Sequence, residues 1–136
     1  MPDVRAMLAQ DRFAAHSGIT LEYVEAGNAR ARLRVGPQHL NGVGIVQGGA
    51  IFTLADFAFA AACNSTGSVA VAIDVSISFL KAVTHGELVA EAHEEAASAR
   101  ISSTLVRVTD HQGALVAIFK GTAYRKRDGE GGKPAA

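Results

Sequence analysis

The sequence predicts an α+β domain in which one long helix is surrounded by a curved antiparallel sheet. Residues 48–64 form an apolar run of helical length, strand-like segments lie on both sides of it, and short turns separate the later segments. A helix that is apolar on nearly every side must be covered by other structure. A sheet curled around it is the simplest cover, and a second subunit is expected to cover the remaining surface.

The chain is expected to begin with a short amphipathic helix over residues 3–16, ended by Ser17 and Gly18. The apolar side chains available to one side of this helix are Val4, Met7, Leu8 and Phe13. This helix belongs to a single domain, residues 1–125. The polar, glycine-rich residues 126–136 are predicted to form a flexible tail.

Two strands are predicted next, residues 20–26 and 29–35, joined by a tight turn at Gly27 and Asn28. The second strand alternates between small or apolar residues and arginines: Ala29, Ala31, Leu33 and Val35 on one face, Arg30, Arg32 and Arg34 on the other. This alternation is typical of a half-buried antiparallel strand, here with a basic outer face.

An irregular loop then leads from Gly36 and Pro37 to the central helix at residues 48–64. The rest of the chain reads as strands separated by turns. They are predicted over residues 69–81, 87–97, 100–109 and 114–125.

Composition excludes several classes of protein. Thirteen basic residues balance thirteen acidic ones among 136 residues, so no charge draws the chain to nucleic acid or to an anionic membrane. The apolar run at residues 50–63 is too short to cross a bilayer, which takes ~20 residues. A single cysteine, Cys63, excludes an intramolecular disulfide and suits a cytoplasmic location. The histidines show no metal-binding spacing, and no metal or other cofactor is expected.

Asp56 is the most informative residue, because it is the only Asp, Glu, Lys or Arg between Arg34 and Asp74. Placing a carboxylate in apolar surroundings is costly, and acids of this kind cluster at functional sites. Asp56 could instead be a structural acid at a subunit interface. The glycines at the start of the same helix favour the functional interpretation.

Gly48 and Gly49 leave the first backbone amides of the helix open to a ligand. Such amides lack intrahelical acceptors, so they can stabilise a carbonyl oxygen that gains negative charge. Asp56 could act on that carbonyl as base or nucleophile. It lies ~10 Å along the axis from Gly49, however, at 1.5 Å per residue. An antiparallel second helix would bring its own Asp56 closer, so a two-fold dimer with composite sites is expected.

The motif around Asp56 resembles the hotdog-fold acyl-CoA thioesterases of the PaaI type. It reads Asn41-Gly42-x4-Gln47-Gly48-Gly49-x2-Phe52-x-Leu54-Ala55-Asp56-x-Ala58-Phe59-Ala60. Weaker similarity continues through three further segments, 62–65, 79–81 and 116–121, so the resemblance covers nearly the whole chain after residue 18. It implies a hotdog fold and hydrolysis of an acyl-CoA, with an aryl or medium-chain acyl group, by a homodimer or homotetramer.

The resemblance also assigns roles to residues. It makes Asp56 the catalytic carboxylate, Gly48 the donor of the polarising amide, and Asn41 a residue that places water or thioester. Gln47 stands where the family usually carries histidine; its amide can donate a hydrogen bond but cannot titrate. The remaining predicted contacts are with substrate: Gly49 beside the carbonyl, and Phe79, Leu80, Lys81 and Ala82 near the pantetheine arm, with Lys81 and the arginines as candidate phosphate contacts.

Two alternatives stay open at the level of the sequence. Gln47 in place of histidine leaves room for a non-catalytic acyl-CoA-binding or sensor protein on the same fold. Dehydratase or hydratase chemistry is less attractive, because those enzymes generally pair the acid with a histidine. Asn41 could also serve only to hold the backbone of its own loop.

Overall fold

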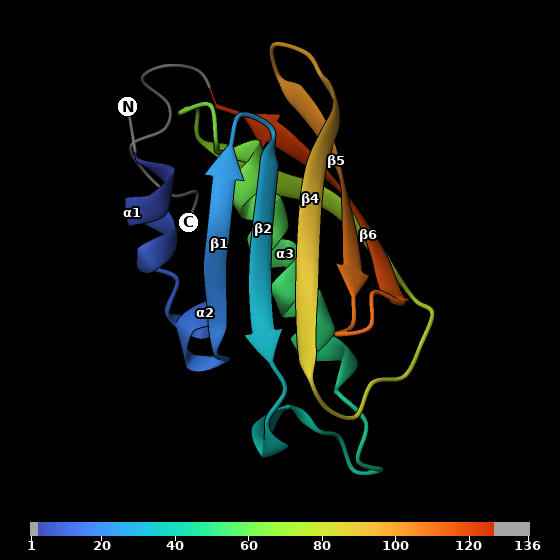
Figure 1. Cartoon of the computed structure of the whole chain (residues 1–136). Coiled ribbons are helices and arrows are strands. Elements are labelled where there is room, and N and C mark those ends of the chain that lie inside the picture. The colour runs from blue at the N-terminus through green and yellow to red at the C-terminus, as the bar shows by residue number, and fades with distance from the viewer. Residues whose placement is uncertain (1–2, 127–136) are drawn as a thin grey trace.

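The computed structural model describes residues 3–126, which form one curved antiparallel sheet around a central helix (Figure 1). The sheet has six strands in the order β1-β2-β4-β5-β6-β3. The elements are α1 (Val4–Ala9), α2 (Arg12–His16), β1 (Ile19–Glu25), β2 (Asn28–Arg34), a 3-10 turn (Pro37–His39), α3 (Gly48–Cys63), β3 (Ala70–Phe79), β4 (Glu87–Ala97), β5 (Ile101–Thr109) and β6 (Leu115–Arg125). The predicted architecture is confirmed.

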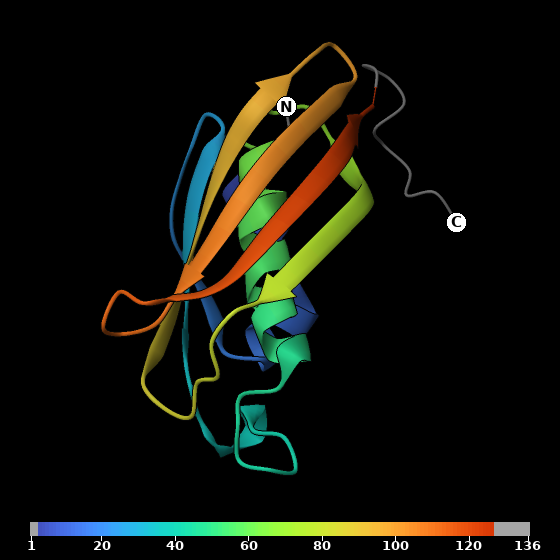
Figure 2. The same ribbon diagram turned by 90° about the vertical axis from the view of Figure 1, so that its right-hand side faces the viewer.

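The central helix α3 lies in the hollow of the sheet, with β1 and β2 on one side and β3 on the other (Figure 2). Nine of its sixteen residues are buried. The partly or fully exposed positions after the first turn fall three or four residues apart, so they lie on one face of the helix. These residues are Phe52, Thr53, Asp56 and Ala60; together with exposed Gly49 of the first turn they form the open stripe, which the sheet leaves uncovered.

Strand β2 shows the predicted alternation. Its small and apolar side chains Ala29, Ala31 and Leu33 are almost completely buried on the helix side of the sheet. Arginines on the outer face form ion pairs with glutamates of the neighbouring strands, including Arg30 with Glu91 at 3.2 Å. These guanidinium groups are already matched by carboxylates, so the arginine row is a paired face of the sheet.

The N-terminal prediction needs a correction, because residues 3–16 form two helices instead of one. Asp11 interrupts the helix and caps α2, where its carboxylate accepts a hydrogen bond from Ala14 N at 3.0 Å. Phe13 was expected on the apolar side, yet 69% of it is exposed. The first hairpin turn also lies one residue earlier than predicted, at Ala26 and Gly27. Apart from Lys126, the predicted tail lies outside the described residues.

A glycine on β6 allows the helix and sheet to approach closely. A Cβ atom on Gly121 would lie 2.5 Å from Cε1 of the Phe59 ring, so any side chain there would overlap α3. Phe59 also packs against Phe119 of the same strand, with ring centroids 5.5 Å apart. Both aromatic rings are almost completely buried, which makes this contact a fixed point of the core.

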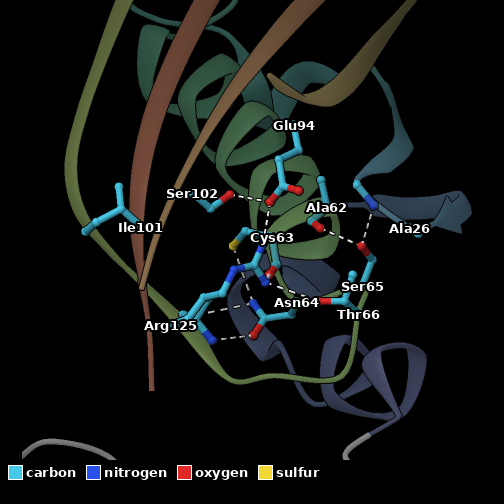
Figure 3. Close-up of polar contacts among 12 residues, drawn as sticks. Ala26, Ala62, Cys63, Asn64, Ser65, Thr66, Glu94, Ile101, Ser102 and Arg125 are labelled. Carbon is cyan, nitrogen blue, oxygen red and sulfur yellow. Dashed lines mark hydrogen bonds and ion pairs between the residues drawn. The ribbon is translucent and has the colours of Figure 1, made fainter. Parts of the chain in front are cut away.

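Polar groups fasten the end of α3 to the sheet (Figure 3). The Arg125 guanidinium reaches from β6 to Cys63 O and Thr66 Oγ1, and it forms an ion pair with Glu94, whose carboxylate also accepts from Ser102. A cation beside the last carbonyls of a helix interacts favourably with the negative end of the helix dipole. This cluster lies at the opposite end of α3 from Gly48, so it supports the fold and not the candidate site.

Candidate active site

The first turn of α3 offers one free backbone amide. Gln47 is the N-cap residue, and its Oε1 accepts a hydrogen bond from Gly49 N at 2.7 Å. The N–H of Gly48, the first residue of the helix, finds no acceptor among residues 3–126. Of the two glycine amides considered from the sequence, the Gly48 amide is therefore the one available to a carbonyl oxygen.

A groove beside this amide brings together residues that are far apart in the sequence. We call it the lysine groove. It is lined by Ile45, Val46, Gly48, Ile51, Phe79, Leu80, Lys81, Ala82 and Val83. A Cβ on Gly48 would lie 3.2 Å from Cζ of Phe79, so the missing side chain lets the phenyl ring lie against the helix start. Five of the nine predicted site residues thus share one surface.

Lys81 is held at the rim of the lysine groove by Asp110. Its Nζ lies 2.5 Å from Asp110 Oδ2, while Oδ1 of the same carboxylate accepts hydrogen bonds from Gln112 N and Ala114 N. The hydrogen bond from Lys81, together with those backbone bonds, lowers the pKa of Asp110 from 3.8 to about 2. The ammonium carries three donors, so it keeps hydrogen-bonding capacity for an anion in the groove.

Asp56 lies on the open stripe of α3, away from the lysine groove. No hydrogen bond or ion pair in the described part of the chain reaches its carboxylate. Burial raises its pKa above 3.8, and the nearby charge of Asp11 raises it further. An acid that is half-buried and unpartnered is poised to accept a proton. Within one chain, however, it is not brought beside Gly48.

Asn41 holds the loop that precedes the helix. Its Oδ1 accepts hydrogen bonds from Val43 N at 3.0 Å and Ile45 N at 3.1 Å, and its own N–H donates to Ile45 O. The loop-holding role considered from the sequence is therefore present. The carboxamide remains exposed, and its NH₂ group donates no hydrogen bond within residues 3–126.

Two residues near the site were missed in the sequence. His39 is buried under the loop, where Nδ1 accepts from Gly36 N and Nε2 therefore carries the proton toward Ser17 O. Its carbonyl accepts from Gln47 N at 2.8 Å, which fixes the start of the helix. Thr53 lies on the open stripe, and its hydroxyl donates a hydrogen bond to Gly49 O. A polar residue four positions after Gly49 in an apolar helix was the available signal for Thr53.

Comparison with known proteins agrees with this fold. Residues 43–117, more than half of the chain, match the family model described as the thioesterase superfamily. The chain therefore belongs to the thioesterase superfamily. Within it, the resemblance to PaaI-type hotdog thioesterases is confirmed by the relatives in sequence and in structure.

Two curated relatives are similar to most of this chain. The acyl-coenzyme A thioesterase PaaI of Escherichia coli is 35% identical over 124 residues, covering 90% of this chain and 89% of the relative. Its solved structure superimposes with a TM-score of 0.87 over 90% of both chains. A protein of Archaeoglobus fulgidus is 44% identical over 103 residues, covering 75% of this chain and 67% of that protein.

None of the helices in residues 3–126 is long and apolar enough to cross a membrane.

Proposed function

We propose that this protein hydrolyses acyl-CoA thioesters to free CoA and a carboxylic acid. The observation that carries the proposal is the free amide of Gly48 at the start of α3, next to a groove that also holds Lys81. Membership of the thioesterase superfamily supports the reaction class. The similarity to the Escherichia coli acyl-CoA thioesterase supports CoA as the carrier of the acyl group.

In the proposed reaction, the thioester carbonyl oxygen accepts a hydrogen bond from the Gly48 N–H. The carboxylate of Asp56 takes a proton from water, and the water oxygen bonds to the carbonyl carbon. Negative charge then gathers on the carbonyl oxygen, where the Gly48 amide stabilises it. The carbon–sulfur bond breaks, the CoA sulfur takes the proton, and the carboxylic acid leaves.

This reaction requires a second subunit, because Asp56 is ~10 Å along α3 from the helix start of its own chain. We propose a homodimer, alone or within a tetramer, in which Asp56 of one chain serves Gly48 of the other. Two exposed features support it. Strand β3 is an edge strand with only β6 beside it and with the exposed apolar side chains Val71 and Ile73. The open stripe of α3 also lacks cover.

The first test is thiol release from a panel of aryl- and alkyl-CoA thioesters. Wild type is expected to turn over at least one substrate, and Asp56→Asn is expected to lose activity by about 10²-fold or more, within the range for a general base. Equal rates for the two proteins would refute the assignment of Asp56. Tight binding of thioesters without turnover by wild type would instead favour an acyl-CoA-binding or sensor protein.

The role of Gly48 has a matched test. Gly48→Pro removes the N–H but suits the first helical position, and Gln47 already has the extended backbone that precedes proline. Gly48→Ala adds a carbon near Phe79 yet keeps the N–H. Loss of activity in Gly48→Pro beyond that of Gly48→Ala, by roughly 10²–10³-fold in kcat, is expected for an amide that binds the oxyanion.

Mixing two inactive variants tests the shared site. A dimer of one Asp56→Asn chain and one Gly48→Pro chain has one site in which both groups are intact, if the site is composite. Co-refolding equal amounts is expected to restore about a quarter of wild-type activity, because half of the dimers are mixed. No recovery in dimers shown to be mixed would place both groups in one chain. We also propose a cytoplasmic location, which the single cysteine, free and buried, supports.

A further inference from the structure

A second groove opens at the start of α3, and its lining differs in charge from the lysine groove. We call it the uncharged groove. It is lined by Phe13, Ser17, Gln38, His39, Leu40, Gln47, Gly49, Ala50, Phe52 and Thr53. Gly48 lines the lysine groove and Gly49 lines this one, so the first turn of the helix separates the two.

Within one chain, no Asp, Glu, Lys or Arg contributes to the lining of the uncharged groove, and Gly49, Phe52 and Thr53 of this lining belong to the open stripe that the proposed partner faces. His39 belongs to it, but both of its ring nitrogens are already hydrogen-bonded within the chain, Nδ1 to Gly36 N and Nε2 to Ser17 O. Apolar walls come from Phe13 and Leu40 on one side and Ala50 and Phe52 of α3 on the other. Such a surface favours an uncharged, apolar group and disfavours a nucleotide phosphate.

Phe13 is the unusual member of this lining. It is the most exposed aromatic side chain in residues 3–126, at 69%, although it lies in the amphipathic N-terminal segment. Exposure of a phenyl ring leaves apolar surface in water that binding of a ligand would remove. The ring belongs to α2, a five-residue helix. The N-cap residue of this helix, Asp11, is also the residue whose charge raises the pKa of Asp56.

We infer that the acyl group of the substrate binds in the uncharged groove against Phe13, while the CoA portion occupies the lysine groove. The inference rests on the proposed thioester function, because it takes the carbonyl to lie at the amide between the two grooves. A thioester joins an anionic carrier to an acyl group through one carbonyl. The two grooves on either side of the helix start match that division in charge. Phe13 thereby selects acyl groups with a ring or a medium-length chain over acetyl.

Binding to an inert thioether analogue tests this without relying on turnover. The ratio of the dissociation constants of CoA and phenacyl-CoA measures how much the aryl group contributes to binding. In Phe13→Ala this ratio is expected to fall roughly 10-fold, within the range for apolar pocket contacts, while the affinity for CoA itself stays unchanged. Phe13→Leu, which keeps apolar bulk, is expected to retain most of the ratio. Leu80→Ala in the lysine groove is expected to weaken both ligands equally.

Kinetics supply the second readout. Phe13→Ala is expected to lower kcat/KM for phenylacetyl-CoA and hexanoyl-CoA by roughly 10-fold and to leave acetyl-CoA hydrolysis within about twofold. An unchanged ligand ratio would overturn the inference, and an accompanying change in sedimentation would show that Phe13 contacts a second copy of the chain instead. If no thioester is hydrolysed by wild type but the ratio falls in Phe13→Ala, the proposed function fails and the groove assignment stands.

Discussion

Gln47 Oε1 accepts a hydrogen bond from Gly49 N at 2.7 Å, so the side chain of Gln47 is the N-cap of α3. This bond occupies the second amide of the helix and leaves the Gly48 amide free. The NH₂ group of the same carboxamide remains a donor. Gln47 therefore fixes the helix start and contributes no titratable group to it.

The cap can be tested by stability. Gln47→Ala removes the side-chain acceptor from Gly49 N, and the free energy of unfolding is expected to fall by about 1 kcal/mol. Asparagine is among the preferred N-cap residues, so Gln47→Asn is expected to retain the stability of the parent protein. Urea denaturation followed by circular dichroism measures both. Equal midpoints for Gln47→Ala and wild type would show that the cap contributes nothing.

The charge of Asp11 is expected to affect how kcat/KM depends on pH. Asp56 must be ionised to act as a base, so kcat/KM falls as pH drops through its pKa, which burial and Asp11 both raise. Asp11→Asn removes the neighbouring charge but keeps a side-chain cap on Ala14 N. The acidic limb of the profile is expected to move to lower pH.

Asp3→Asn is the matched control for this experiment. Asp3 caps α1 through Arg5 N in the same way that Asp11 caps α2, yet it does not contribute to the raised pKa of Asp56. Its profile should overlay that of wild type. An identical acidic limb in Asp11→Asn and Asp3→Asn would remove Asp11 from the electrostatics of the site.

The contact between Phe59 and Gly121 gives a prediction about the core. In Gly121→Ala the new methyl group would lie 2.5–2.8 Å from three ring atoms of Phe59. The ring is buried and cannot move aside, so overpacking is expected to cost ~1–3 kcal/mol in the free energy of unfolding. Gly42→Ala, where the added carbon meets nothing within 4 Å, is expected to change stability little.

A double-mutant cycle tests whether the loss of stability in Gly121→Ala comes from overlap with Phe59 or from a general intolerance of side chains at this position of β6. Phe59→Leu shortens the side chain that Gly121→Ala strikes, so the double variant should be less destabilised than the sum of the single variants. Additive losses would show that the two positions do not touch in solution.

The order and type of the elements were predictable because local patterns determine them. The alternation of Ala29, Ala31 and Leu33 with arginines identified β2, and the apolar run ending at Cys63 identified α3 within one residue. The N-terminal region was predicted less well. There, Asp11 competes for a backbone N–H as a cap, and this local hydrogen bond ends one helix and starts another.

The sequence by itself determined a central helix with a glycine amide at its start and an acid two turns later, because spacing along a helix is set by its geometry. Only the tertiary structure decided what surrounds those groups. Packing of α2 brings Asp11 close enough to raise the pKa of Asp56, and the sheet places Phe79 against Gly48, a contact that the sequence offered only through the family resemblance. Contacts between residues distant in the chain depend on how whole elements pack, which no local pattern records.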